Sequence, residues 1–325
     1  MNTLIIPILA SNANVGASLH AVGLPSANAI TGFAHAALRL IRDLTGANPS
    51  DQGAAFIINK YTLLPGRQKP QKAEHGDKGD TKKGALDASL SDERLAIIEG
   101  WVVVRFGVGL SGLTMIQDKL SDIAEQLHRL GFAGGVLSIP SKLRLFEGDD
   151  SGFEAFSDLP PNARVVVDHT QDLERYATAY DLDFFEAMIR LLVISHEQGA
   201  QFYKSKVSED TSEEKPAEEK STETQTEEST IDCPLLPMDQ HLVEDRAVFE
   251  SAYLGHLVPI DIGYRALEEP QERTARGSYL HVFAEPVTGI ARVQLVSSLM
   301  RRKESETAFW QHVNNHPMYL SKGAV

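Results

Sequence analysis

The order of apolar segments in the first 145 residues restricts the fold more than any other feature of the sequence. Short runs rich in β-branched residues indicate strands, and apolar residues at every third or fourth position indicate amphipathic helices. The order is strand, helix, strand, strand, helix, strand, at residues 3–9, 30–44, 54–64, 97–110, 115–130 and 134–145. This is the β-α-β-β-α-β order of ferredoxin-like and RNA-recognition-motif (RAMP) folds, so we predict an α+β core of that kind over residues 1–150. Because such folds include both enzymes and binding modules, the order does not fix the function.

Residues after this core read as a helical insert and a smaller C-terminal part. Helical spacing over residues 168–180 and 182–197 predicts a helical insert at 151–205. Strands are predicted at 256–266 and 279–284, and a helix from about Ile290 to Phe309. Two short strands and one helix make a thin core, so we expect residues 233–325 to pack on the first part of the chain.

Charge is concentrated in one segment. Residues 208–232 hold ten acidic residues and two lysines, which account for −8 of the net charge of −14. This segment has almost no large apolar side chains, so it cannot offset its own ordering entropy. We predict a disordered acidic loop over residues 206–232, either an exposed connection without a specific role or an acidic interaction segment.

The sequence carries none of the common enzyme motifs. It has no P-loop, no dinucleotide-binding glycine motif, no HExxH and no CxxC, and we predict no catalytic residue, metal or cofactor. His20 and His35 flank the first loop and are the residues that favour the alternative, an acid–base pair that cleaves RNA. A single cysteine, Cys233, fits a reducing cytoplasm, and no apolar run is long enough to span a membrane.

A basic excursion separates the second and third predicted strands. Residues 60–83 contain seven Lys or Arg residues and three acids. The connection between the two strands, with its hairpin at about 60–96, is much longer than the usual two to five residues. We predict a long basic β-hairpin, a thumb, that contacts nucleic-acid phosphates rather than a merely solvated loop. A second basic group, Arg292, Arg301, Arg302 and Lys303, is expected on the last helix, as the other end of one groove.

The loop at residues 11–28 has small side chains at a strand-to-helix turn. A nucleotide backbone can approach such a loop closely, and Asn12, Asn14 and Asn28 offer donors and acceptors for base edges. A plain turn fits this pattern equally well. Ser26 or Asn28 can cap the helix that follows. The predicted RNA-binding residues are Asn12, Asn14, His20, Ser26, Asn28, His35, Lys60, Arg67, Lys69, Lys72, Lys82, Lys83, Arg292, Arg301 and Arg302.

Three short motifs in residues 11–40 resemble those of a known protein family. They are N-A-N at residues 12–14, G-x-P-S at 23–26, and A-x-T-G-F-x-H-A at 29–36. A fourth motif, L-V-P-I-x-x-G-Y-x-A-L, lies in the strand at 257–267, and residues 134–139 match more loosely. With these motifs the chain resembles a Csy-type subunit of type I-F CRISPR surveillance (Cascade) complexes, a Cas-five family protein. The acidic segment lies outside the resemblance.

The resemblance implies a function. Members of this family bind the 5′ handle of the CRISPR RNA, and their thumb folds over the RNA and interrupts its pairing with target DNA. It implies as partners a backbone subunit and, where present, a large subunit. In variant systems without a large subunit, the protein itself recognises the protospacer-adjacent motif of the target DNA, for which residues 168–200 are the candidate region.

The sequence therefore predicts a non-catalytic, cytoplasmic RNA-binding subunit that caps the CRISPR RNA 5′ handle. Two alternatives stay open. One is a precursor-RNA endoribonuclease that uses His20 or His35 as general base, as a member of the wider family does in type I-C systems. The other is a protein scaffold without RNA affinity of its own.

Overall fold

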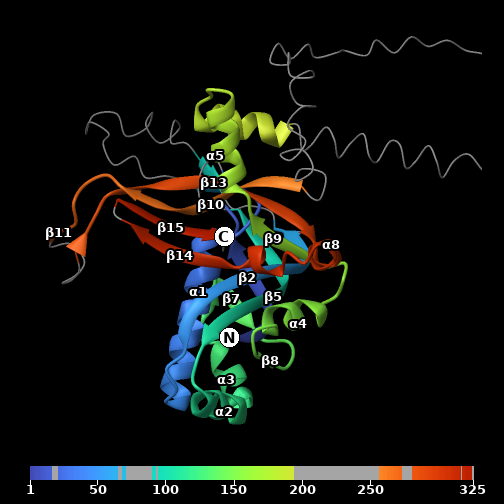
Figure 1. Cartoon of the computed structure of the whole chain (residues 1–325). Coiled ribbons are helices and arrows are strands. Elements are labelled where there is room, and N and C mark those ends of the chain that lie inside the picture. Colours follow the sequence, from blue (N-terminus) through green and yellow to red (C-terminus); the bar gives the residue numbers. More distant parts are fainter. Residues whose placement is uncertain are drawn as a thin grey trace, which may run out of the picture.

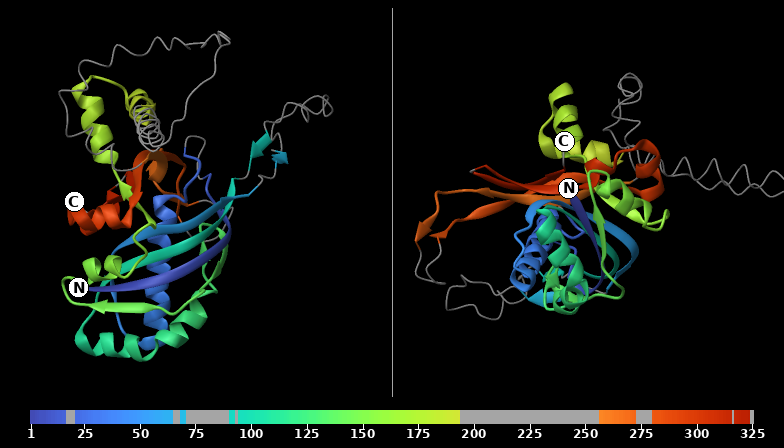
Figure 2. Two further views of the ribbon diagram at one scale, coloured as in Figure 1. Left: turned by 90° about the vertical axis from the view of Figure 1, so that its right-hand side faces the viewer. Right: turned by 60° about the horizontal axis from the view of Figure 1, so that its bottom comes forward.

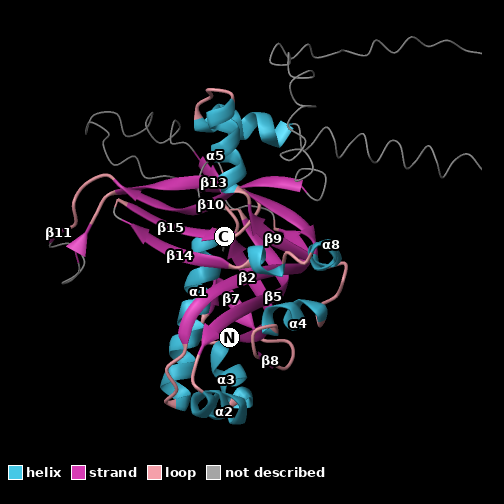
Figure 3. Ribbon diagram, viewed as in Figure 1, coloured by secondary structure: helices cyan, strands magenta, loops and turns pink. Residues whose placement is uncertain are grey.

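The computed structural model describes residues 1–16, 21–64, 68–70, 90–92, 94–193, 256–272, 280–315 and 317–323. The predicted acidic loop at 206–232 lies outside these ranges. The described chain is a mixed α/β structure with one large antiparallel sheet and helices on both of its faces (Figures 1 and 3). No helix in this part of the chain is long and apolar enough to cross a membrane.

Strands and helices are interspersed along the described chain. The strands are β1 (Asn2–Asn14), β2 (Ser50–Leu63), β3 (Gln68–Pro70), β4 (Leu90–Asp92), β5 (Leu95–Gly107), β6 (Gly131–Phe132), β7 (Gly135–Ser138), β8 (Arg144–Glu147), β9 (Arg164–Asp168), β10 (His256–Ala266), β11 (Gln271–Glu272), β12 (Leu280–His281), β13 (Ala284–Leu295), β14 (Trp310–Asn315) and β15 (Met318–Gly323). The helices are α1 (Ala27–Thr45), α2 (Leu110–Asp118), α3 (Leu120–Leu127), α4 (Ser151–Ser157), α5 (Thr170–Ala179) and α8 (Val296–Arg302), with a 3₁₀ turn η1 (Ser305–Ala308). Residues 184–193 are also helical.

The first part of the chain forms the strand order β2-β5-β1-β7. Alternate residues of β1 face opposite sides, so Leu4, Ile6 and Ile8 pack against α1, α2 and α3 while Ile5 faces the other way. Pro7 of β1 falls between the residues that pair with β8 and those that pair with β7. No neighbouring strand therefore requires the N–H that proline lacks on that side.

The opposite face of the sheet is covered by α4, α8 and η1. Phe156 and Phe309 are buried there, with ring centroids 5.8 Å apart. The guanidinium of Arg105 lies 3.7 Å from the centre of the Phe309 ring, and its Nη1 donates to Glu306 Oε2 at 2.6 Å. The cation–π contact and the ion pair together compensate the positive charge of Arg105 on an otherwise apolar face.

The C-terminal strands extend the same sheet rather than forming a separate layer. The order continues from β2 through β9, β13, β10, β15 and β14, and β14 also pairs with β2 at Trp310 and Ala54. Trp310 is fully buried and its Nε1 donates to the backbone oxygen of Val166 at 3.0 Å. The described C-terminal strands therefore share one sheet with the strands of the first part of the chain.

Several predicted elements are confirmed, and others are wrong in part. The strands predicted at 3–9, 54–64 and 97–110 correspond to β1, β2 and β5, and the first helix is α1. However, β1 continues to Asn14, so Asn12 and Asn14 lie on a strand and not in the loop predicted from residue 11. The helix predicted at 115–130 is two helices, separated at Lys119.

Two further predictions concern the second half. The insert predicted as helical contains strand β9, which lies inside the sheet between β13 and β2. Its sequence, Arg-Val-Val-Val-Asp, is short and lies next to segments with helical spacing, so the local pattern does not distinguish this strand from the helical insert. The helix predicted from about Ile290 to Phe309 is wrong in its first part, because β13 continues to Leu295, and within this range the α-helix covers Val296–Arg302, followed by the 3₁₀ turn η1.

The close approach of β5 and β2 gives a stability prediction. A Cβ added at Gly100 would lie 2.0 Å from the backbone oxygen of Ile57, whereas a Cβ at Gly32, within α1, would meet nothing within 4 Å. We expect Gly100→Ala to destabilise the protein by about 2 kcal/mol or more, because a backbone carbonyl must move. Gly32→Ala, the matched control, should stabilise it by about 0.5–1 kcal/mol. Urea unfolding of both variants tests this, and equal midpoints would contradict it.

Candidate nucleic-acid interface

The end of β1 carries an irregularity at Asn12. The register between β1 and β5 shifts between Ala10 and Ala13, and Asn12 has a φ of 58°. Asparagine tolerates this left-handed conformation better than most residues. The Asn12 side chain is exposed and makes no hydrogen bond with the described residues. The bulge therefore presents an uncommitted amide at the end of the sheet.

Asn14, two residues further, is already engaged. Its Oδ1 accepts a hydrogen bond from the backbone N–H of Gly16 at 3.0 Å. The chain then folds back, because Gly16 and Val22 form a β-bridge and the Gly23 N–H donates to Val15 O at 2.6 Å. This return brings the start of α1 beside the end of β1.

The base of the predicted thumb lies at the same end of the sheet. The Val15 N–H donates to Arg94 O at 2.9 Å, and the Leu64 N–H donates to Leu95 O at 2.8 Å. Beyond these residues β3 and β4 pair as a small separate ladder, with Lys69 opposite Ser91 (Figure 2). Lys60 is exposed near the end of β2. His20, Arg67, Lys72, Lys82 and Lys83 lie outside the described residues.

The first turn of α1 is held by two predicted residues with different roles. Ser26 is the N-cap, and its Oγ accepts a hydrogen bond from the Ala29 N–H at 3.1 Å. Asn28 does not cap the helix. Its Oδ1 accepts a hydrogen bond from Ser321 Oγ at 2.6 Å, so the amide contacts the C-terminal hairpin β14–β15.

His35 lies two turns further along α1, beside two other ionisable groups. Its Nδ1 is 3.9 Å from Asp51 Oδ2, and 56% of its side chain is exposed. Burial lowers the pKa of nearby His312 below its usual value, with Asp51 opposing and His35 reinforcing this shift. The His35–Asp51 distance is long for an oriented acid–base pair, in contrast to His169 and Asp172, which are 2.6 Å apart.

The sequence predicts Arg292 in a basic group at the surface of the last helix. In the structure this residue is buried. It lies on β13 and is 3% exposed, with its Nη2 3.9 Å from Glu304 Oε2. Burial lowers the pKa of its guanidinium to about 10, while Glu304 and Asp172 favour the charged form and Arg302 disfavours it. A buried, charge-compensated arginine of this kind belongs to the packing of β13 and not to a phosphate-binding surface.

Arg301 and Arg302 are exposed on α8. Arg302 Nη1 lies 3.4 Å from Glu304 Oε1, so part of its charge is neutralised locally. Helix α8 packs on the sheet face opposite to α1. Asn12 and Asn14 are thus connected to Ser26 and Asn28 through the loop that returns from β1 to α1, whereas the second basic group lies on the other face of the sheet.

Sequence reasoning missed the contact between the C-terminal hairpin and the start of α1. Ser321 is fully buried and lies within hydrogen-bond distance of Asn28, which is 293 residues away in the chain. A lone serine in a short strand gives no sequence signal for such a contact. The neighbourhood of Asp51 and His312 also has no sequence signal, because it depends on the pairing of β14 with the start of β2, at the end of that strand opposite to the base of the predicted thumb.

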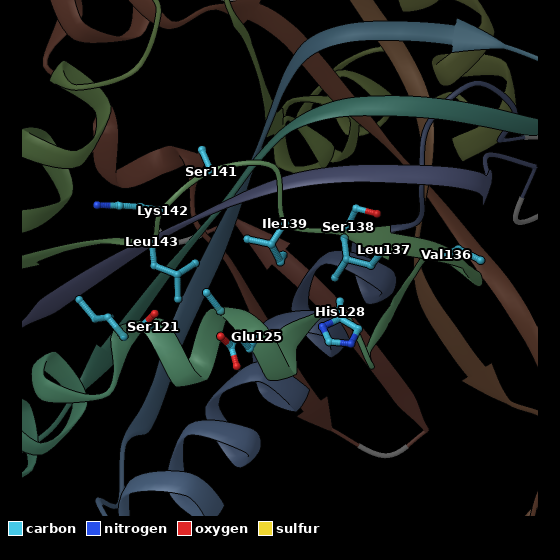
Figure 4. Close-up of a pocket in the computed structure, with 12 residues that line it drawn as sticks. Ser121, Glu125, His128, Val136, Leu137, Ser138, Ile139, Ser141, Lys142 and Leu143 are labelled. Carbon is cyan, nitrogen blue, oxygen red and sulfur yellow. The ribbon is translucent and has the colours of Figure 1, made fainter.

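A separate groove lies between α3 and the segment after β7. Its volume is about 930 Å³, and Leu120, Ala124, Leu137, Ile139 and Leu143 make much of its lining. Figure 4 shows Ile139 and Leu143 directed toward α3, with Glu125 and His128 along that helix. Its apolar lining is unlike a phosphate-binding surface, so we do not include it in the interface. In the described part of the chain no group of His, Cys, Asp and Glu side chains is arranged to hold a metal ion.

Comparison with known proteins adds one finding. The model of the family described as CRISPR-associated protein (Cas_Csy2) matches residues 4–321. No curated protein matches the chain.

The contrast between Arg292 and Arg301 gives a prediction. We expect Arg292→Ala to lower the free energy of unfolding by about 3 kcal/mol, because Asp172 and Glu304 lose their buried counter-charge. Arg301→Ala, on the exposed side of α8, should change it by less than about 0.5 kcal/mol. Urea unfolding measures both values. Equal effects would mean that Arg292 is not the packing residue that its burial indicates.

Proposed function

The chain belongs to the Cas_Csy2 family of CRISPR-associated proteins, and from this premise we propose that it is the subunit that binds and caps the 5′ handle of the CRISPR RNA in a type I-F interference complex. Family membership implies a subunit of a CRISPR-Cas complex. The handle-binding role, the complex type and a cytoplasmic location are our proposals.

One observation carries the proposal. The returning loop after β1 and the base of the β3–β4 hairpin contact each other through the Val15–Arg94 hydrogen bond, at the end of the sheet where Asn12 is exposed. A strand of RNA at this end would meet exposed amides on one side and the lysine-rich hairpin sequence on the other. Amides are suited to base edges and lysines to phosphates.

The strand order supports the proposed ferredoxin-like core. The four strands that alternate with α1 and with α2–α3 are arranged β2-β5-β1-β7, and both helical segments lie on one face. In this arrangement the first and third strands in the chain are central, as in a split β-α-β fold. The hairpin β3–β4 would then be the thumb.

Local charge supports nucleic acid over a protein scaffold. The whole chain has a net charge of −14, but residues 60–83 have seven basic and three acidic residues. Beyond a Debye length of about 8 Å, distant acidic groups are screened at physiological salt, so the local positive segment determines contact with phosphates.

We propose a non-catalytic role and the following partners. The protein would contact a backbone subunit, a large subunit where one exists, and target DNA near the protospacer-adjacent motif. The endoribonuclease alternative depends on His20 or His35. His35 is mostly exposed and 3.9 Å from Asp51, so it lacks a short orienting hydrogen bond, which argues against the alternative.

The thumb lysines give the test. Replacing Lys69, Lys72, Lys82 and Lys83 together by Ala should weaken binding of 5′-handle RNA and lower the slope of log affinity against log salt by about 0.7 for each lost phosphate contact. Fluorescence anisotropy over a salt series measures both quantities. Denaturing gels of the same samples show whether the RNA stays intact, and a discrete product would favour the endoribonuclease.

The matched control replaces four exposed basic residues that lie away from this end, Arg42, Lys119, Lys142 and Arg175. It removes the same number of charges, so it should leave the salt slope unchanged. If both variants lose the same slope, general charge and not the thumb determines binding. If the unsubstituted protein does not bind at low salt, the scaffold alternative is favoured.

A further inference from the structure

A small group of polar side chains joins the start of α1 to the C-terminal hairpin. Ser321 of β15 is fully buried, and its Oγ lies 2.6 Å from Asn28 Oδ1, 2.8 Å from Thr31 Oγ1 and 3.4 Å from His312 Nδ1. These contacts connect segments about 290 residues apart in the chain. Ser26 and Asn28 belong to the same turn of α1, and the loop before this turn returns from the end of β1 through the Gly16–Val22 bridge.

The hydrogen atoms in this group can be assigned by elimination. Asn28 Oδ1 has no hydrogen, so the 2.6 Å contact requires Ser321 to donate its single hydroxyl hydrogen. Ser321 can then only accept from its other neighbours. Thr31 Oγ1 lies within reach of both Ser321 Oγ and Ala27 O, at 3.2 Å, and can donate to either.

The consequence for Asn28 is a fixed orientation of its amide. With Oδ1 held by Ser321, Nδ2 is the polar atom of this side chain that remains for another partner. Nδ2 has no hydrogen-bond partner among the described residues. It is also not one of the fully buried polar atoms that lack a partner. Asn28 therefore keeps two N–H donors that the described residues do not use, while its carbonyl is already engaged.

We propose that Ser321 is a positioning residue that orients Asn28 so that Nδ2 donates to a hydrogen-bond acceptor of the bound RNA. This inference rests on the proposed function and makes it more specific. A phosphate oxygen and an acceptor atom on a base edge are the two sources of such an acceptor. An exocyclic amino group is excluded as a partner, because it offers only donors.

The test uses the full-length chain and 5′-handle RNA, with affinity measured by fluorescence anisotropy. Asn28→Asp keeps the acceptor for Ser321 but removes both N–H donors, so it should weaken binding about tenfold or more, the scale of one hydrogen bond to a charged group. Ser321→Ala leaves the Asn28 amide unoriented, and we expect a loss of about three- to tenfold. Thermal melting of each variant records any loss of fold separately.

A double-mutant cycle separates positioning from structure. If Ser321 acts through Asn28, Ser321→Ala should weaken binding in the unsubstituted protein but have no further effect in the Asn28→Ala background. A structural role would lower the melting temperature and leave the RNA affinity of the folded protein unchanged in both backgrounds. Independent losses that add would also overturn the inference.

Modified RNA distinguishes the two acceptors. A scan of single methylphosphonate linkages, and a parallel scan of bases that lack one acceptor atom, should each be run on the unsubstituted protein and on Asn28→Ala. One modification should weaken binding to the unsubstituted protein and not to the variant, and the scan to which it belongs identifies phosphate or base. If no modification shows this pattern although the RNA binds, the Asn28 inference fails alone. If the RNA does not bind at all, the proposed function fails with it.

Discussion

The structure depends on strand β2, which pairs with three other strands. One edge pairs with β5 from Ser50 to Leu63, and the other is divided between β9 at Phe56–Ile58 and β14 at Ala54. The division is possible because the chain is irregular between Asp51 and Ala54. Gly53 has a φ of 111°, and a Cβ there would lie 2.9 Å from Trp310 O. Trp310, buried and bonded to Val166 O, then fixes β14 against the sheet.

This junction has a consequence for the proposed interface. Because β14 is fixed against β2, the β14–β15 hairpin lies beside α1, where Ser321 meets Asn28 and Thr31. The first turn of α1 is thus held from two sides, by its own cap Ser26 and by a hairpin from the other end of the chain. For the proposed RNA-binding role, a rigid support of this kind lowers the entropic cost of ordering the amides.

Local patterns in the sequence predicted the elements that depend on interactions between neighbouring residues. The apolar runs of β1, β2 and β5, the spacing of α1, and the cap at Ser26 were all predictable, since each depends on neighbouring residues. Strand β9 was not, because five residues between helical patterns become a strand only when β13 and β2 lie on either side. Arg292 was misplaced for the same reason: its burial depends on β9 and β10, which flank it. Asn12 and Asn28 are among the residues that the sequence predicts for the site. Ser321 is not, because its contact with Asn28 joins opposite ends of the chain.

The central claim is that RNA lies at the end of the sheet formed by the β1 loop, the start of α1 and the base of the thumb. Photo-crosslinking of 4-thiouridine-substituted handle RNA, followed by mass spectrometry of the crosslinked peptides, tests it most directly. The account predicts crosslinks in peptides that contain Asn12 to Asn28 and in the segment between β2 and β5. Crosslinks confined to α8, or to the apolar groove beside α3, would contradict it.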